Sequence, residues 1–139
     1  MIKYIVSAIV LSGVALNVYA MPKKPNACPK AAAIKSGGLA YADKDQGAYV
    51  VYQISNYGTK YTWGFGIGDF QANSAQQAIS KGYSALSTLR GNPSPTPIYD
   101  ENVWACLYST NGGHMAIAFT PLPIGTKMKQ SMMMLPTNS

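Results

Sequence analysis

The stretch Trp63-Gly64-Phe65-Gly66-Ile67-Gly68-Asp69-Phe70 alternates bulky apolar residues with glycines as far as Gly68. Successive side chains of a strand point to opposite faces, so the stretch predicts a strand over residues 61–70. Trp63, Phe65 and Ile67 would share one face, and the three glycines would leave the other face bare. A bare strand face normally marks a place where another element or a ligand comes close.

The segment after this strand predicts the element that approaches the glycines. Asn73 or Ser74 can start a helix there, and Gly91 can end it after Arg90. Small residues recur along one stripe of this helix, namely Ala75, Ala78, Gly82 and Ala85. We therefore expect this stripe to rest on the glycines. The alternative is a shallow groove with a backbone floor, and the candidate binding residues are then Trp63, Gly64, Gly66, Gly68 and His114.

Turn and strand signals before the predicted strand over residues 61–70 and after the helix that follows it predict one α+β domain. A first helix is expected over residues 27–36, capped by Asn26 and ended by Gly37-Gly38. The other expected strands cover residues 39–42, 48–55, 102–109 and 114–120, and residues 92–99 form a proline-rich extended connector. The order α-β-β-β-α-β-β predicts an antiparallel sheet of about five strands with two helices. Strand 102–109 is apolar on both faces, which is typical of a central strand.

The first twenty residues have the pattern of an export signal. Lys3 precedes an apolar run over residues 4–16, and Val18-Tyr19-Ala20 offers small residues at the cleavage-determining positions. The run is too short to span a bilayer, and no transmembrane segment is expected in the mature chain. We therefore expect a secreted or periplasmic protein with a signal peptide at 1–20, a domain at 21–120 and a tail at 121–139. The tail contains Pro121 and a methionine group, Met128 and Met132 to Met134.

The chain contains two cysteines, Cys28 and Cys106, both beyond the expected signal. A single pair in an exported chain predicts a disulfide, which we favour over two free thiols. A metal site needs several His or Cys ligands, and the chain has one histidine, His114. No metal and no cofactor are therefore expected.

Two short motifs suggest a family. Ala27-Cys28-Pro29 precedes an alanine-rich segment, and Trp104-Ala105-Cys106 follows late in the chain. With these features, most of the mature chain resembles an uncharacterised family of small exported proteins of Gram-negative bacteria. The resemblance implies a fold, and it supplies no functional residues because that family has no assigned chemistry.

Charge and composition indicate which classes of molecule the protein is suited to bind. The formal net charge is +6, and loss of Lys3 with the signal leaves ten basic against five acidic residues, hence +5. The basic residues are scattered and include one arginine, Arg90. This pattern does not favour nucleic-acid binding, which usually relies on clustered arginines. Ten tyrosines and a low charged fraction of 12% favour a β-rich domain with tyrosines on its surface.

Two functions of different class are consistent with these residues. The first is an exported, non-enzymatic binding or interaction protein, whose tyrosine-rich sheet contacts another protein or an envelope component. The alternative is a small hydrolase that uses His114 as a base together with Asp100 or Glu101. The surroundings of His114 distinguish them, because a base needs a cleft and an acid within reach.

Overall fold

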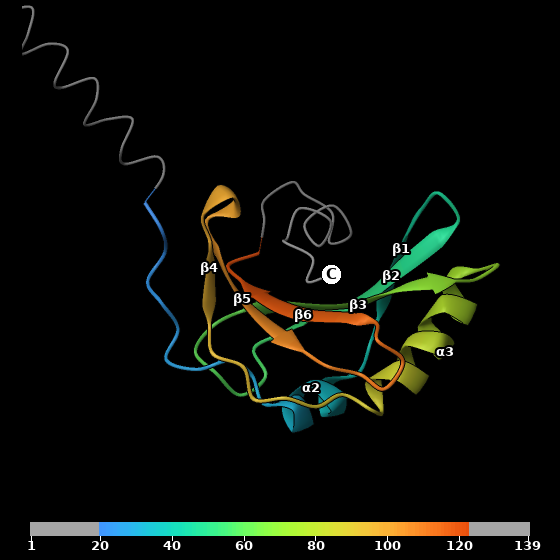
Figure 1. Ribbon diagram of the computed structural model, residues 1–139, viewed down its shortest axis with the longest axis horizontal. Helices are drawn as coiled ribbons and strands as arrows, with labels where there is room; N and C mark the ends of the chain where they lie inside the picture. The colour runs from blue at the N-terminus through green and yellow to red at the C-terminus, as the bar shows by residue number, and fades with distance from the viewer. Residues whose placement is uncertain (1–19, 123–139) are drawn as a thin grey trace, which may run out of the picture.

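Two α-helices and six strands follow one another in residues 20–122, the part of the chain that the computed structural model describes (Figure 1). The elements are α2 (Ala31–Gly37), β1 (Tyr41–Asp45), β2 (Ala48–Ser55), β3 (Trp63–Gln71), α3 (Ala75–Leu86), β4 (Thr96–Ile98), the 3-10 turn η1 (Tyr99–Glu101), β5 (Val103–Tyr108) and β6 (Met115–Thr120). The expected export signal, except for its last residue, lies outside the described residues. So do Met128 and Met132 to Met134 of the expected tail.

The six strands form one antiparallel sheet in the order β1-β2-β3-β6-β5-β4. The predicted α+β class is confirmed, and the strand count of about five is one too low. The additional strand is β4, which lies in the segment expected to be a connector and pairs with β5. Pro97 has no N–H to donate, so β4 is restricted to the edge of the sheet. Because β4 pairs with β5, β5 lies inside the sheet, as its two apolar faces predict.

Both helices differ from their predicted bounds. The first begins at Ala31 and not at 27, and Asn26 does not cap it. Cys28 stands before Pro29, and a residue before proline avoids the helical region, so this part of the chain stays extended. The second helix begins as predicted after Ser74, whose side chain accepts a hydrogen bond from the Gln77 N–H at 3.1 Å. It ends at Leu86 and not at Arg90.

The two faces of the sheet differ in what covers them. Both helices lie on the face that carries Trp63, Phe65 and Ile67, here called the helix face (Figure 1). The opposite face, here called the glycine face, carries Gly64, Gly66 and Gly68 with their cross-strand neighbours. The expected contact between the second helix and the three glycines is therefore wrong. Covering large side chains removes far more apolar area from water than covering glycine backbone.

Close approach of the helix to the sheet comes from the helix itself. A Cβ atom at Gly82 of α3 would lie 3.0 Å from Leu39 Cδ1 and 3.3 Å from Val51 Cβ. Val51 pairs with Ile67 and therefore lies on the helix face. Two residues of the predicted stripe, Ala78 and Gly82, are buried in this contact, whereas Ala75 at its start is exposed, and the stripe packs on the helix face and not on the glycines.

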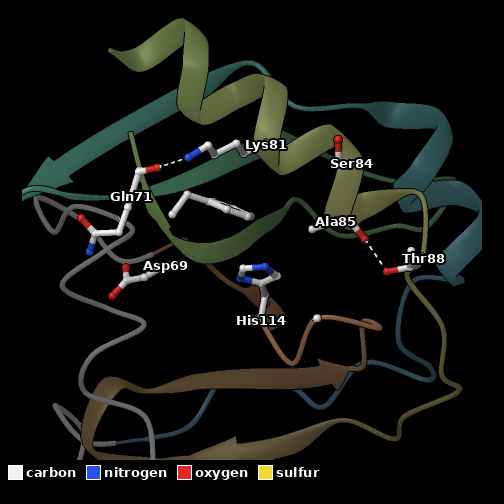
Figure 2. A pocket seen from close by; sticks show the side chains of 9 residues that line it. Asp69, Gln71, Lys81, Ser84, Ala85, Thr88 and His114 are labelled. Atoms are coloured by element: carbon white, nitrogen blue, oxygen red, sulfur yellow. Dashed lines mark hydrogen bonds between the residues drawn. The ribbon is translucent and has the colours of Figure 1, made fainter. Parts of the chain in front are cut away.

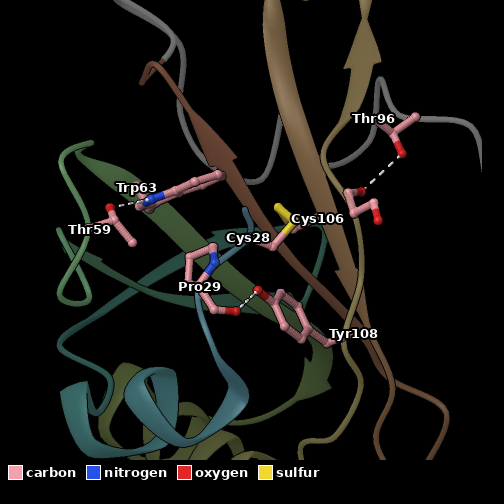
Figure 3. Close-up of a disulfide and its surroundings, with 8 residues drawn as sticks. Cys28, Pro29, Thr59, Trp63, Thr96, Cys106 and Tyr108 are labelled. Carbon is pink, nitrogen blue, oxygen red and sulfur yellow. Dashed lines mark hydrogen bonds between the residues drawn. A yellow bond between two sulfur atoms is a disulfide. The ribbon is translucent and has the colours of Figure 1, made fainter. Parts of the chain in front are cut away.

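The predicted disulfide between Cys28 and Cys106 is confirmed, with the two Cα atoms 5.9 Å apart (Figure 3). It joins the segment before α2 to β5 across 78 positions of sequence. The Tyr108 hydroxyl donates a hydrogen bond to the Pro29 carbonyl, and the Trp104 indole N–H donates to the Pro22 carbonyl at 3.0 Å. The disulfide and these two bonds hold the N-terminal segment against the helix face.

Candidate functional site

A cleft of about 530 Å³ opens where α3 passes the end of β3 and the start of β6 (Figure 2). His114 comes from the loop before β6, and its imidazole packs on the ring of Phe70, with the centroids 4.5 Å apart. Asp69 and Gln71 flank Phe70 on the β3 side, and Lys81 lies on the α3 side. Three segments that are distant in sequence therefore build this cleft.

The loop between β5 and β6 positions His114 through its backbone. The His114 N–H donates to Thr110 Oγ1 at 3.1 Å, which closes the turn that contains Gly112 and Gly113. A Cβ atom at position 112 would lie 3.1 Å from His114 Cδ2, so glycine makes room for the imidazole. Thr110 thus stabilises the turn and does not act on the ring.

The hydroxyl groups of the cleft are directed away from His114. Ser84 Oγ donates to the Ser80 carbonyl at 3.4 Å, and Thr88 Oγ1 donates to the Ala85 carbonyl at 2.8 Å. Both are hydrogen bonds to a neighbouring carbonyl of α3 and leave no serine or threonine aligned with the imidazole. Residues 20–122 also contain no group of three His, Cys, Asp or Glu side chains that would hold a metal ion.

Asp100 and Glu101, the acids expected to assist His114, lie at the other end of the β5–β6 hairpin. They belong to η1, directly before β5, whereas His114 follows β5 and stands at the start of β6. Six residues of strand at about 3.3 Å each put about 20 Å between the two ends. The structure therefore does not bring His114 together with either acid.

The predicted binding residues fall in separate places. Trp63 is 0% exposed on the helix face, and its indole N–H donates to Thr59 Oγ1 at 2.9 Å (Figure 3). Gly64, Gly66 and Gly68 are buried on the glycine face, and His114 lies in the cleft. Trp63 is thus a core residue, and the five residues do not form one site.

An exposed aromatic group that sequence reasoning missed lies on the glycine face at the β1 edge. Tyr41 and Tyr52 face each other across β1 and β2 with their rings stacked at 5.1 Å, and Ile54 follows on the same face. Tyr41 is 50% exposed and Ile54 is 42% exposed. We call these three residues the tyrosine patch. Partial burial, and to a smaller extent the charge of Asp43, raises the pKa of the Tyr52 hydroxyl.

A signal for this patch was present in the sequence. The hairpin turn consists of Gln46 and Gly47, which have φ angles of 53° and 86°, so Asp45 pairs with Ala48. Counting back along both strands from that pair places Tyr41 opposite Tyr52. The strands predicted over residues 39–42 and 48–55 leave residues 43–47 as a five-residue turn. With a turn of that length, the pairing of Tyr41 with Tyr52 could not be counted from the sequence.

Comparisons with known proteins add a family to this description. No curated protein and no solved structure matches the chain. Among the described residues, no helix is long and apolar enough to cross a membrane. A family described as a domain of unknown function (DUF4949) matches residues 27–134, in agreement with the expected uncharacterised family, and the chain belongs to that family.

Proposed function

We propose that this chain is an exported, non-catalytic binding protein that contacts an acidic partner protein through the tyrosine patch. The observation that carries the proposal is the stacked pair Tyr41 and Tyr52 beside Ile54, exposed at an edge of the sheet. Tyrosine is enriched among residues that dominate protein interfaces, because its ring buries a large area and its hydroxyl remains able to hydrogen-bond. A stacked pair is also held in place before the partner arrives, which reduces the entropy lost on binding.

Charge favours an acidic partner. The chain without its first twenty residues has a formal charge of +5, and a net charge of this sign accelerates encounter with acidic proteins at low salt. Lys44 of β1 points to the helix face, where its ammonium group lies 5.9 Å from the centre of the Tyr49 ring, so the attraction rests on the net charge of the chain and not on a cation within the patch. The proposal therefore includes a partner whose contact surface combines apolar groups with carboxylates.

Export is supported by two independent features. The disulfide Cys28–Cys106 is of a kind that persists in oxidising compartments and is rare in the cytosol of mesophiles. Residues 1–20 have the charge, length and cleavage pattern of a signal peptide. Absence of catalysis is supported by the hydroxyls of the cleft, which are engaged with carbonyls of α3 and not with His114.

Site-specific photo-crosslinking tests this function. A photoreactive phenylalanine analogue at position 41 should give one discrete protein adduct in cells that export the chain. The matched control is the same analogue at position 99, because Tyr99 is 72% exposed but lies in η1, beside the opposite edge of the sheet.

The expected result is an adduct at position 41 that disappears with Ile54→Ser and weakens at high salt, with none at position 99. Equal labelling at the two positions, or no adduct at position 41, would overturn the proposal. An adduct that resists proteases and is digested by glycan hydrolases would also overturn it, because the partner would then be a polysaccharide.

A further inference from the structure

One row of residues across the glycine face is exposed at both ends and buried in the middle. In order across β1, β2, β3, β6 and β5 the row contains Tyr41, Tyr52, Gly66, Ile117 and Leu107. Tyr41 is 50% exposed, Ile117 is 0% exposed and Leu107 is 48% exposed. Neighbours within a sheet shield the sides of a side chain and leave its tip open, so a fully buried isoleucine requires a cover above the sheet.

The buried middle extends beyond this row. Val50, Val103, Ala105, Ile117 and Phe119 form a second apolar cluster, separate from the one beneath the helices. Every residue of this cluster is at most 4% exposed. Both described helices lie on the other side of the sheet, so within residues 20–122 no helix covers the cluster (Figure 1).

We propose that residues 123–139, the C-terminal segment of the same chain, pack across the glycine face and cover this second cluster. The segment starts directly after Leu122, and β6, which ends at Thr120, is an inner strand of the sheet. Strands lie about 4.8 Å apart, so β1 is about 14 Å from β6. Extended at about 3.3 Å per residue, the segment reaches more than 50 Å and can cross the whole face.

The composition of the segment suits packing on the second apolar cluster of the glycine face. It carries Ile124, Met128, Met132 to Met134 and Leu135. Methionine is unbranched and flexible, and it fills the irregular space that lies over glycines beside bulky Ile117 and Phe119. Burying such side chains removes apolar area from water, which favours packing of the segment on the cluster.

The extent of the family match supports an integral role for the segment. The match to the family runs from residue 27 to residue 134, and it therefore includes all three consecutive methionines. Because this part of the segment lies within the family's domain, we expect it to pack on that domain and not to extend from it as a separate tail. Coverage of the middle of the face also explains why exposure remains at the tyrosine patch and at Leu107, on its two sides.

Methyl NMR on the full chain tests this contact directly. With methionine methyls labelled and assigned by single Met→Leu substitutions, we expect nuclear Overhauser effects from at least one of Met132 to Met134 to Ile117 or Phe119. Tail methyls with random-coil shifts and no effect to this face would overturn the proposal. Effects seen only between differently labelled molecules would overturn it too, because a second copy would then supply the cover.

A variant pair gives a second, independent readout. The triple substitution Met132→Ser, Met133→Ser and Met134→Ser should uncover the cluster and raise the fluorescence of an apolar dye such as ANS several-fold. The control, Lys127→Ser with Lys129→Ser, changes the same segment without removing apolar surface and should leave dye binding unchanged. Equal dye binding by the two variants, both folded by circular dichroism, would contradict the proposal. If the triple variant does not fold, the NMR result on the unchanged chain decides.

Discussion

Substitution of Gly82 by valine tests the packing of α3 on the helix face. The Cβ alone would lie 3.0 Å from Leu39 Cδ1 and 3.3 Å from Val51 Cβ, closer than the 3.5–4.0 Å at which carbon atoms attract each other best. Leu39 and Val51 are both buried, and the two γ-carbons of valine need additional room. Overpacking of this kind typically costs about 1–3 kcal/mol.

A smaller effect of opposite sign must be subtracted. Valine is a better helix former than glycine by about 0.4 kcal/mol, so the expected net loss in the free energy of unfolding is about 2 kcal/mol. For a domain of this size that loss corresponds to a fall in melting temperature of about 10 °C. Urea denaturation followed by tryptophan fluorescence measures it, because Trp63 lies in the same core cluster.

The matched control is Ser80→Val in the same helix. Ser80 is exposed, and serine and valine have similar helix propensities, so this change should stay within about 0.5 kcal/mol of the parent. If Gly82→Val and Ser80→Val have the same effect, α3 does not approach the sheet through Gly82, and the assignment of the helix face is refuted.

Four further predictions concern the core and the sheet. Reduction of the Cys28–Cys106 disulfide, which spans 78 positions, should lower the free energy of unfolding by about 4.5 kcal/mol on the chain-entropy estimate; a loss below about 1 kcal/mol in denaturation with and without reductant would contradict this. The Tyr57 hydroxyl is buried and has no hydrogen-bond partner among the described residues, so Tyr57→Phe should leave the free energy of unfolding unchanged or raise it. Tyr108→Phe removes the hydrogen bond to the Pro29 carbonyl beside the disulfide and should lower that free energy by about 1 kcal/mol. Burial raises the pKa of both hydroxyls above the ordinary value of 10, so the free energy of unfolding should be constant below pH 10 and fall as the pH rises above it. Unfolding curves recorded at alkaline pH should show a smaller fall for Tyr57→Phe than for the parent protein. Gly68→Ala should cost about 1–3 kcal/mol, because its Cβ would lie 3.0 Å from the Tyr49 carbonyl oxygen, a backbone atom of β2 that has little room to move; an unchanged midpoint in urea would refute this.

Local patterns determined most of the elements. Residues 48–55 are rich in β-branched and aromatic residues and lie between turn signals, and β2 has the predicted bounds. Ser74 caps α3 through its own side chain, which is a property of a few neighbouring residues. The disulfide followed from the number of cysteines and the expected compartment, because one pair allows one connectivity.

Properties that depend on distant segments were not predictable in this way. Alternation along β3 shows that its two faces differ, but the choice of the face that the helices cover depends on the total apolar area that each face buries with all its neighbours. Strand β4 has only three residues and contains a proline, so its sequence does not indicate a strand. It is a strand because it forms hydrogen bonds with β5.

The candidate sites show the same division. Gly112 and Gly113 directly precede His114 in the sequence, and the structure places this histidine at the end of their turn. Phe70 and Lys81 join it only because β3, α3 and the β5–β6 loop meet at one corner, and Asp100 and Glu101 are excluded because a whole strand separates them from it. Sequence by itself determined the local elements, whose hydrogen bonds and caps lie within a few residues. The tertiary structure alone decided which faces are covered and which side chains meet, because these depend on packing between segments far apart in the chain.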